Sequence, residues 1–233
     1  MALIKFGAGI ADMRGSIGGV VFSRNRFGAI ARNRTKPVDP SSAYQQVMRQ
    51  AVQTLAILWR TVLTADQRDE WATYAANVAW INALGETQYL TGFNMYVRSN
   101  CSIAQAGLTR VDDGPSELSL PAADSTFAVA ATADDQKLAI TFDDTADWCD
   151  LAGNALLIYC SMPTRATVNF FKGPYRFVDA IEGSVGSPPT TGTELDLPFV
   201  CATGQKVFVQ GRLVTVDGRL SQPFRSSCLC AAS

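Results

Sequence analysis

The chain has 233 residues, of which 47% are hydrophobic and 18% charged, with a formal net charge of −1. Ordinary apolar content and a net charge near zero exclude disorder of the whole chain, and the length accommodates one large domain or two small ones. The absence of histidine excludes Ser-His-Asp, Cys-His and histidine-ligated metal mechanisms within this chain.

The charged residues are distributed unevenly. Residues 1–60 carry nine basic and two acidic side chains, whereas residues 114–233 carry thirteen acidic and eight basic ones. This division predicts that the two ends of the chain meet different surroundings, or complementary surfaces on neighbouring subunits. The alternative is that the basic side chains are simply solvated.

Residues 1–40 are predicted to form an extended basic arm. Glycines interrupt short β-prone runs, and residues 20–23 and 29–31 flank a segment, residues 24–28, in which Asn and Gly can reverse the chain. We therefore expect one β-hairpin in the arm. Because a two-stranded hairpin is marginal in water, the arm should be ordered mainly by packing on another surface.

Residues 41–107 are predicted to form a small module of three helices. Apolar residues recur at helical spacing over residues 44–62. Thr64 followed by Gln67 has the pattern of a capping box and predicts the start of the second helix. Thr91 is expected to begin the third helix. The aromatic side chains on these helices indicate either a helical core or a partner-binding groove, and they are Trp59, Trp71, Tyr74 and Trp80.

Residues 108–121 have the composition of a linker, and residues 122–233 change to an alternating pattern typical of strands. Strands are predicted at residues 137–142, 155–160, 175–178 and 206–216. Asp217-Gly218 supplies a hairpin turn after the last of these. Short strands at this spacing favour an immunoglobulin-like antiparallel β-sandwich. The predicted fold class is therefore α+β: an arm with a hairpin, a helical module and a sandwich.

The six cysteines are expected to be reduced structural thiols, with disulfides formed later in an oxidising medium as the alternative. They are Cys101, Cys149, Cys160, Cys201, Cys228 and Cys230. Their spacing does not match a zinc site. The N-terminal ten residues are too weakly apolar for a signal peptide, and no window is long enough for a membrane span. We therefore expect assembly in the cytoplasm, with no membrane partner.

Three aspartate doublets are the remaining candidates for acid/base chemistry: Asp112-Asp113, Asp134-Asp135 and Asp143-Asp144. Neighbouring residues on a strand point to opposite faces, so a doublet does not supply two facing carboxylates. Hydrogen bonding within loops is the favoured interpretation, ahead of calcium binding and catalysis. The glycine-rich residues 15–19 lack the Gly-Lys-Ser/Thr ending of a phosphate loop. We predict no enzymatic activity, no catalytic residue, no cofactor and no metal.

The arginines of the arm are the most informative feature. Within each pair, Arg24 with Arg26 and Arg32 with Arg34, the even separation would place both side chains on one side of a strand. Guanidinium groups match carboxylates and phosphates alike, so the arm could dock on an acidic protein or on a nucleic-acid backbone. The candidate partner-binding residues are Arg14, Phe22, Arg24, Arg26, Phe27, Arg32, Arg34 and Lys36.

The N-terminal half resembles a family of uncharacterised structural proteins of tailed bacteriophages and prophages. The resemblance spans about residues 7–110. It is carried by residues 11–28 (ADMRGSIGGVVFSRNRFG), 31–34 (ARNR), 37–40 (PVDP), Gln45-Gln46, 63–71 (LTADQRDEW) and 90–96 (LTGFNMY). It implies a virion component and carries no catalytic residue across. Residues 207–223 resemble the last hairpin of fibronectin type III and related immunoglobulin-like modules.

These observations predict a non-enzymatic virion protein, assembled in the host bacterial cytoplasm. Its arm and helices would bind major capsid or neck proteins, as a capsid decoration (cement) protein or as a neck, collar or tail component, and it would form homo-oligomers. A nucleic-acid-binding packaging factor that uses the same arginines is the alternative of another class, and the less favoured one. A host-surface adhesin that uses the sandwich is a further alternative.

Overall fold

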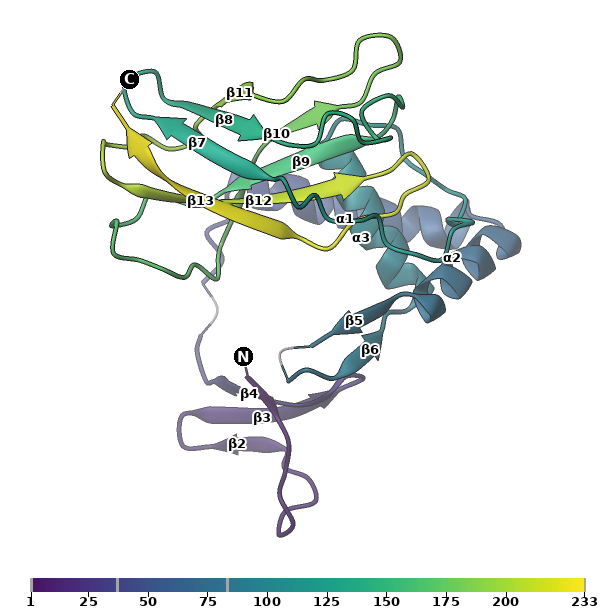
Figure 1. The fold of residues 1–233 in the computed structure, drawn as a ribbon. Helices are drawn as coiled ribbons and strands as arrows, with labels where there is room; N and C mark the ends of the chain where they lie inside the picture. Colours follow the sequence, from purple (N-terminus) through teal and green to yellow (C-terminus); the bar gives the residue numbers. More distant parts are fainter. Residues whose placement is uncertain (1, 37, 83, 233) are drawn as a thin grey trace.

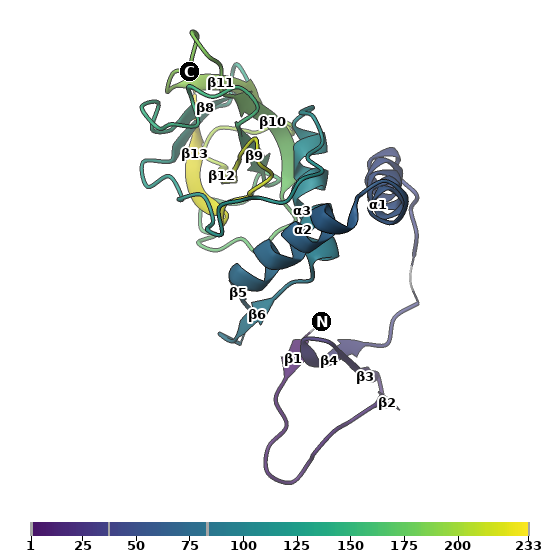
Figure 2. The ribbon, with the colours of Figure 1, turned by 90° about the vertical axis from the view of Figure 1, so that its right-hand side faces the viewer.

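A computed structural model describes residues 2–36, 38–82 and 84–232. A small N-terminal sheet and a larger C-terminal β-domain lie at opposite ends of the molecule, and the helices lie between them (Figures 1 and 2). The predicted α+β class is confirmed. No helix within the described ranges is long and apolar enough to span a membrane.

The N-terminal sheet has four antiparallel strands in the order β1-β4-β3-β2. They are β1 (Ala2–Ile4), β2 (Gly15–Ile17), β3 (Val20–Asn25) and β4 (Gly28–Asn33). The predicted hairpin is the β3–β4 pair, which turns at Arg26 and Phe27. The expectation of an otherwise extended arm was wrong, because β1 pairs with β4 and β2 with β3. These two outer strands have three residues each, too few to show a clear alternating pattern in the sequence.

The helices are α1 (Ala43–Thr61), α2 (Ala65–Asn77) and α3 (Gly92–Gln105). Each begins after a hydroxyl residue whose side chain accepts a backbone N–H bond: Ser42, Thr64 and Thr91. The capping box of Thr64 and Gln67 is present. The sequence did not predict a short hairpin, β5 (Ala79–Ile81) with β6 (Thr87–Tyr89), between α2 and α3.

The centre of the helical module is Trp71, which is fully buried. Its ring makes edge contacts with Tyr74 and Tyr96, with centroids 6.1 and 5.6 Å apart. The indole N–H donates to the backbone oxygen of Asp112 at 3.0 Å. This arrangement shows that Trp71 and Tyr74 belong to the helical core, whereas the side chains of Trp59 and Trp80 pack at its edge.

The β-domain contains a seven-stranded sheet in the order β10-β9-β12-β13-β7-β8-β11. Its strands are β7 (Ala128–Thr132), β8 (Lys137–Thr141), β9 (Ala155–Cys160), β10 (Arg176–Glu182), β11 (Thr193–Asp196), β12 (Lys206–Val214) and β13 (Phe224–Ala231). All neighbouring strands are antiparallel except β13 and β7. The sheet curls until it is nearly closed (Figure 2), and the apolar side chains of its inner face form the largest core of the protein.

The helix α3 joins the helical module to the β-domain. Its Tyr96 packs in the core around Trp71, while Ile103, two turns further on, packs with Leu157 and Val214 on the outer face of β9 and β12. The chain after α3 is held to the same helix, because the buried Asn100 side chain accepts from the backbone N–H of Val111 and donates to its oxygen, both at 2.9 Å. Part of the predicted linker is therefore packed on the helices.

The structure joins Cys201 to Cys230 by a disulfide, so the expectation of six reduced thiols was wrong for this pair. Both side chains lie in the core of the β-domain. The sequence could not identify the pair, because the two residues are 29 positions apart and are brought together only by the folding of the domain.

We predict that the disulfide stabilises the β-domain by restricting the unfolded chain. For a loop of this length, the Cys201→Ala/Cys230→Ala variant should lose about 3–4 kcal/mol of unfolding free energy, measured by denaturant titration. A reductant should destabilise the wild type and leave the double variant unchanged. Equal stability of the two proteins under oxidising conditions would contradict this account.

We also predict that Gly92 is required for the contact between α2 and α3. A Cβ at this position would lie 2.7 Å from the backbone nitrogen of Ala72, so Gly92→Ala should cost roughly 1–3 kcal/mol of unfolding free energy. The matched control is Gly19→Ala, where a Cβ meets nothing within 4 Å. A control as destabilised as the test variant would show that helix packing is not the cause.

Candidate binding surfaces

The eight candidate residues lie in or beside the N-terminal sheet, but its two faces carry different members of the set. The β3–β4 register pairs Phe22 with Ala31 and Val21 with Arg32. Because side chains alternate along a strand, Arg24 lies on the same face as Phe22, and Arg32 lies on the opposite face. Phe22 is half-buried, and both arginines are exposed.

The other candidates lie outside these strands. Arg26 and Phe27 form the hairpin turn, where the Asn25 side chain accepts from the backbone N–H of Phe27 at 2.9 Å. Arg34 follows the end of β4. The expected arginine pairs on one side of a strand are therefore not present as such, because only one member of each pair lies within a strand.

The candidates gather at two ends of the sheet. Arg14 and Arg24 share Asp12, at 3.0 and 4.0 Å, so one acidic group partly neutralises that end. Arg32, Arg34 and Lys36 lie at the other end, are exposed, and have no ion-pair partner among the described residues. Arg26, in the hairpin turn, is also exposed without an ion-pair partner among the described residues, so positive charge is left uncompensated at both ends of the sheet and in greater amount after the middle of β4.

Few contacts connect this sheet to the rest of the molecule. The Gln88 side chain of β6 donates to the backbone oxygen of Phe27 at 3.2 Å, and Lys5 forms an ion pair with Glu86. This lysine lowers the pKa of the Glu86 carboxyl. On the connection to α1, a bidentate contact with Arg49 at 2.9 Å lowers the pKa of Asp39 to about 2.

The N-terminal sheet is a single layer. None of the three apolar clusters formed by the described residues contains one of its side chains. Its buried residues in the described chain are Ala29 and Ile30, at 9% and 8% exposure, and Ile17 is 63% exposed. A sheet normally buries at least one face against a second layer, so this sheet has an incomplete core.

The helix α1 adds an exposed apolar strip. Tyr44, Val47 and Val62 are 48%, 59% and 53% exposed. Their spacing places them on one side of the helix together with the half-buried Leu58. The same side of α1 packs on α3 through Leu55, seven residues before Val62, and the Tyr44 hydroxyl accepts from the Gln105 side chain of α3 at 2.9 Å. The exposed apolar side chains therefore lie at the two ends of this packing face.

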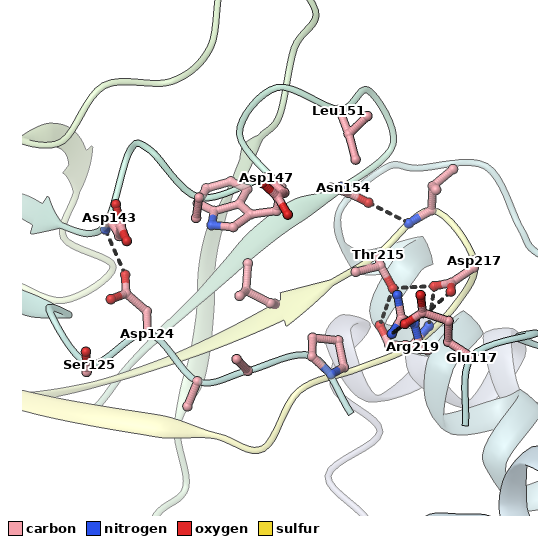
Figure 3. A pocket seen from close by; sticks show the side chains of 17 residues that line it. Glu117, Asp124, Ser125, Asp143, Asp147, Leu151, Asn154, Thr215, Asp217 and Arg219 are labelled. Carbon is pink, nitrogen blue, oxygen red and sulfur yellow. Dashed lines mark hydrogen bonds and ion pairs between the residues drawn. The ribbon is translucent and has the colours of Figure 1, made fainter. Parts of the chain in front are cut away.

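A second surface is a cleft of about 560 Å³ at the end of the β-domain where β12 ends and β9 begins (Figure 3). Its wall includes Trp148 and Leu213, which are nearly buried, and the exposed Leu151 and Val216. The charged groups that line it are Glu117, Asp124, Asp143, Asp147, Asp217 and Arg219. Five carboxylates against one guanidinium make this cleft acidic.

The carboxylates of the cleft differ in how they are bonded. Arg219 contacts Glu117 at 2.6 Å and Asp217 at 2.7 Å. Asp143 accepts two hydrogen bonds from Thr145, which lower the pKa of its carboxyl. Asp147 is exposed and has no hydrogen-bond or ion-pair partner among the described residues.

Local hydrogen bonding, the interpretation that the sequence favoured, is seen at Asp143, which accepts from Thr145 two residues further on. Two other members of the doublets accept from residues that are distant in the chain. Asp113 accepts from Gln67 at 2.7 Å, and Asp144 accepts from the backbone of Thr191 at 3.2 Å. Two free cysteines are buried in the β-domain. Burial raises the pKa of Cys160 to about 12 and that of Cys149 to about 11. Thiols with such values are protonated at neutral pH and are poor nucleophiles.

Comparison with known proteins gives no match: no family model, no curated protein and no solved structure is significantly similar to this chain.

The single-layer sheet should open far more readily than the β-domain. We predict that backbone amides of β3 and β4 exchange with deuterium at least about a hundredfold faster than those of β9 and β12, because few buried contacts oppose opening. The measurement is hydrogen exchange read by mass spectrometry, in dilute protein at high salt. Equal protection of both sheets would show that the N-terminal sheet is stable by itself.

Proposed function

We propose that this chain is a non-enzymatic structural protein of a tailed-bacteriophage virion. Its N-terminal sheet would dock on a capsid or neck protein. The observation that carries the proposal is the N-terminal sheet, which contributes no side chain to the apolar clusters of the described residues and whose free end bears Arg32, Arg34 and Lys36. The residue pattern over the N-terminal half, which resembles phage structural proteins, supports the same role.

The chemistry of docking follows from these side chains. A partner surface would cover the half-buried Val20 and Phe22 on one face of the sheet, and carboxylates on the partner would pair with the guanidinium groups. The exposed strip of α1 lies next in the chain and would extend the apolar contact. Many copies on one particle would multiply a modest affinity.

We further propose that residues 122–233 form an immunoglobulin-like sandwich. Supporting this, β10, β9, β12 and β13 form one antiparallel set and β7, β8 and β11 another. Only two residue pairs of the parallel β13–β7 contact join the sets. The inner side chains of both sets share one core, as in a two-layer sandwich.

A capsid decoration protein is our preferred position, and a neck, collar or tail position is the alternative. Quantitative mass spectrometry of virions produced by the genome that encodes this chain separates them. Decoration requires on the order of hundreds of copies per particle, and a ring at the neck requires about a dozen. Absence of the chain from washed virions would refute the virion role.

We predict that a variant lacking residues 2–36 no longer pellets with shells assembled from the capsid and neck proteins of the same genome. Because the apolar clusters lie outside the deleted segment, the remainder should keep its circular dichroism spectrum. The matched control is Arg165→Glu/Lys172→Glu on the β-domain, which should pellet like the wild type. Undiminished pelleting of the deletion variant would contradict arm-mediated docking.

The nucleic-acid alternative makes a different prediction for the same arginines. A packaging factor would bind DNA at low salt and lose affinity steeply as salt rises. Gel-shift measurements with the full chain test this, and DNA binding that the deletion of residues 2–36 abolishes would replace the docking proposal.

A further inference from the structure

The acidic cleft of the β-domain is lined by two hydrogen-bond donors that no acceptor in the described ranges occupies. Asn154 is 2% exposed; its side-chain oxygen accepts from the backbone N–H of Val216 at 2.7 Å, but its amide nitrogen has no acceptor among the described residues. The indole N–H of Trp148, on a side chain 5% exposed, also has none there. Both residues line the cleft (Figure 3 labels Asn154). Neither donor is among the fully buried unpaired polar atoms of the described residues. Each is therefore reached from the cleft and is available to bond water or the acceptor oxygens of a ligand.

The rim of the cleft indicates a ligand that also brings positive charge. Asp147 and Glu117 are exposed and lie apart from each other on its rim (Figure 3). The exposed Leu151 and Val216 add apolar surface between the charged groups. An extended basic peptide meets all three conditions, because its carbonyls accept hydrogen bonds, its cations pair with carboxylates, and its aliphatic stems cover apolar surface.

Such a peptide is present in the chain itself. Arg32, Arg34 and Lys36 alternate along the end of β4 and the segment after it. In an extended backbone, alternate side chains lie on one side, about 6–7 Å apart. All three are exposed and have no ion-pair partner in the described ranges.

The cleft and this basic segment cannot meet within one molecule as it is folded. In both views the N-terminal sheet and the β-domain lie at opposite ends of the molecule (Figures 1 and 2). The cleft belongs to the β-domain and is lined by residues at the end of β12. Two complementary surfaces at opposite ends of one rigid molecule can contact each other only when they belong to different copies. Such head-to-tail contacts produce a ring when the rotation closes and a filament when it does not.

We propose that the basic segment of residues 32–36 binds in the acidic cleft of a second copy of this chain. Arg32, Arg34 and Lys36 pair with rim carboxylates that include Asp147. Backbone carbonyls of the segment accept from Asn154 and Trp148. This contact is between copies and does not depend on the virion role proposed above.

The first test is self-association of the purified full-length chain, measured by sedimentation velocity. At about 100 µM protein and about 20 mM NaCl the wild type should sediment as species larger than a monomer, and at about 500 mM NaCl it should dissociate, because salt screens exposed charges. A monomer under the low-salt condition would overturn the proposal.

Charge reversal identifies the two surfaces. The arm variant Arg32→Glu/Arg34→Glu and the cleft variant Glu117→Lys/Asp147→Lys should each be monomeric, since each then opposes like charges. An equimolar mixture of the two should assemble again, because every arm then meets a cleft of opposite sign. The control Arg165→Glu/Lys172→Glu should assemble like the wild type.

A peptide competition keeps the test independent of variant folding. A synthetic peptide of residues 30–36, added in excess to the wild-type assembly, should disperse it, and the same peptide with glutamate at positions 32, 34 and 36 should not. The proposal would be overturned if the arm variant or the cleft variant, folded and by itself, still assembled. It would also be overturned if the basic peptide did not disperse the wild-type assembly. Sedimentation velocity tests self-association, and shell pelleting tests the virion role. A negative result in one experiment therefore does not decide the other proposal.

Discussion

The burial of Trp71 is the contact on which the arrangement of the molecule depends. Its ring packs on Tyr96 of α3, its N–H is bonded to the backbone of Asp112, and it lies against Gly218 in the turn after β12, where a Cβ would approach it to 3.1 Å. One side chain therefore contacts the helices, the chain that leaves them, and the β-domain. Because α3 packs on both the helical core and the outer face of β9 and β12, the two parts share an apolar boundary.

The N-terminal sheet, by contrast, has little buried apolar packing. Backbone hydrogen bonds connect its four strands, but it lacks a second layer, and hydrogen bonds alone contribute little net stability against the entropy of the chain. Under the proposed function, the partner surface would supply the free energy that holds this sheet rigid. This physical deficit, together with the excess of positive charge at one end, favours a role in assembly. In the self-association that we propose, the acidic cleft at the other end of the molecule would supply the matching surface.

Local signals in the sequence account for the elements that were predicted well. The α1 and α2 boundaries follow from helical apolar spacing and from the capping box at Thr64, both of which act within a few residues. The β9 strand has six apolar or aromatic residues in a row. The missed strands lack such signals: β11 has one buried side chain, Leu195, and β7 is rich in alanine. Their extended conformation is decided by neighbouring strands.

The candidate binding surfaces were likewise predictable from the sequence only in part. The residues of the arm were found from charge and spacing, but their distribution over two faces and two ends depends on strand register. The cleft was not predicted, because its donors and carboxylates come from segments up to about a hundred residues apart in the chain. The aspartates among them appeared in the sequence only as local turn residues.

The sequence by itself determined the absence of histidine chemistry, the three helices, the hairpin of the arm and the separation of basic from acidic charge. These properties depend on composition or on neighbours within one turn or one strand. The tertiary structure decided the Cys201–Cys230 disulfide, the single-layer state of the N-terminal sheet and the acidic cleft. Each of these depends on residues distant in the chain, whose encounter is set by the packing of whole elements.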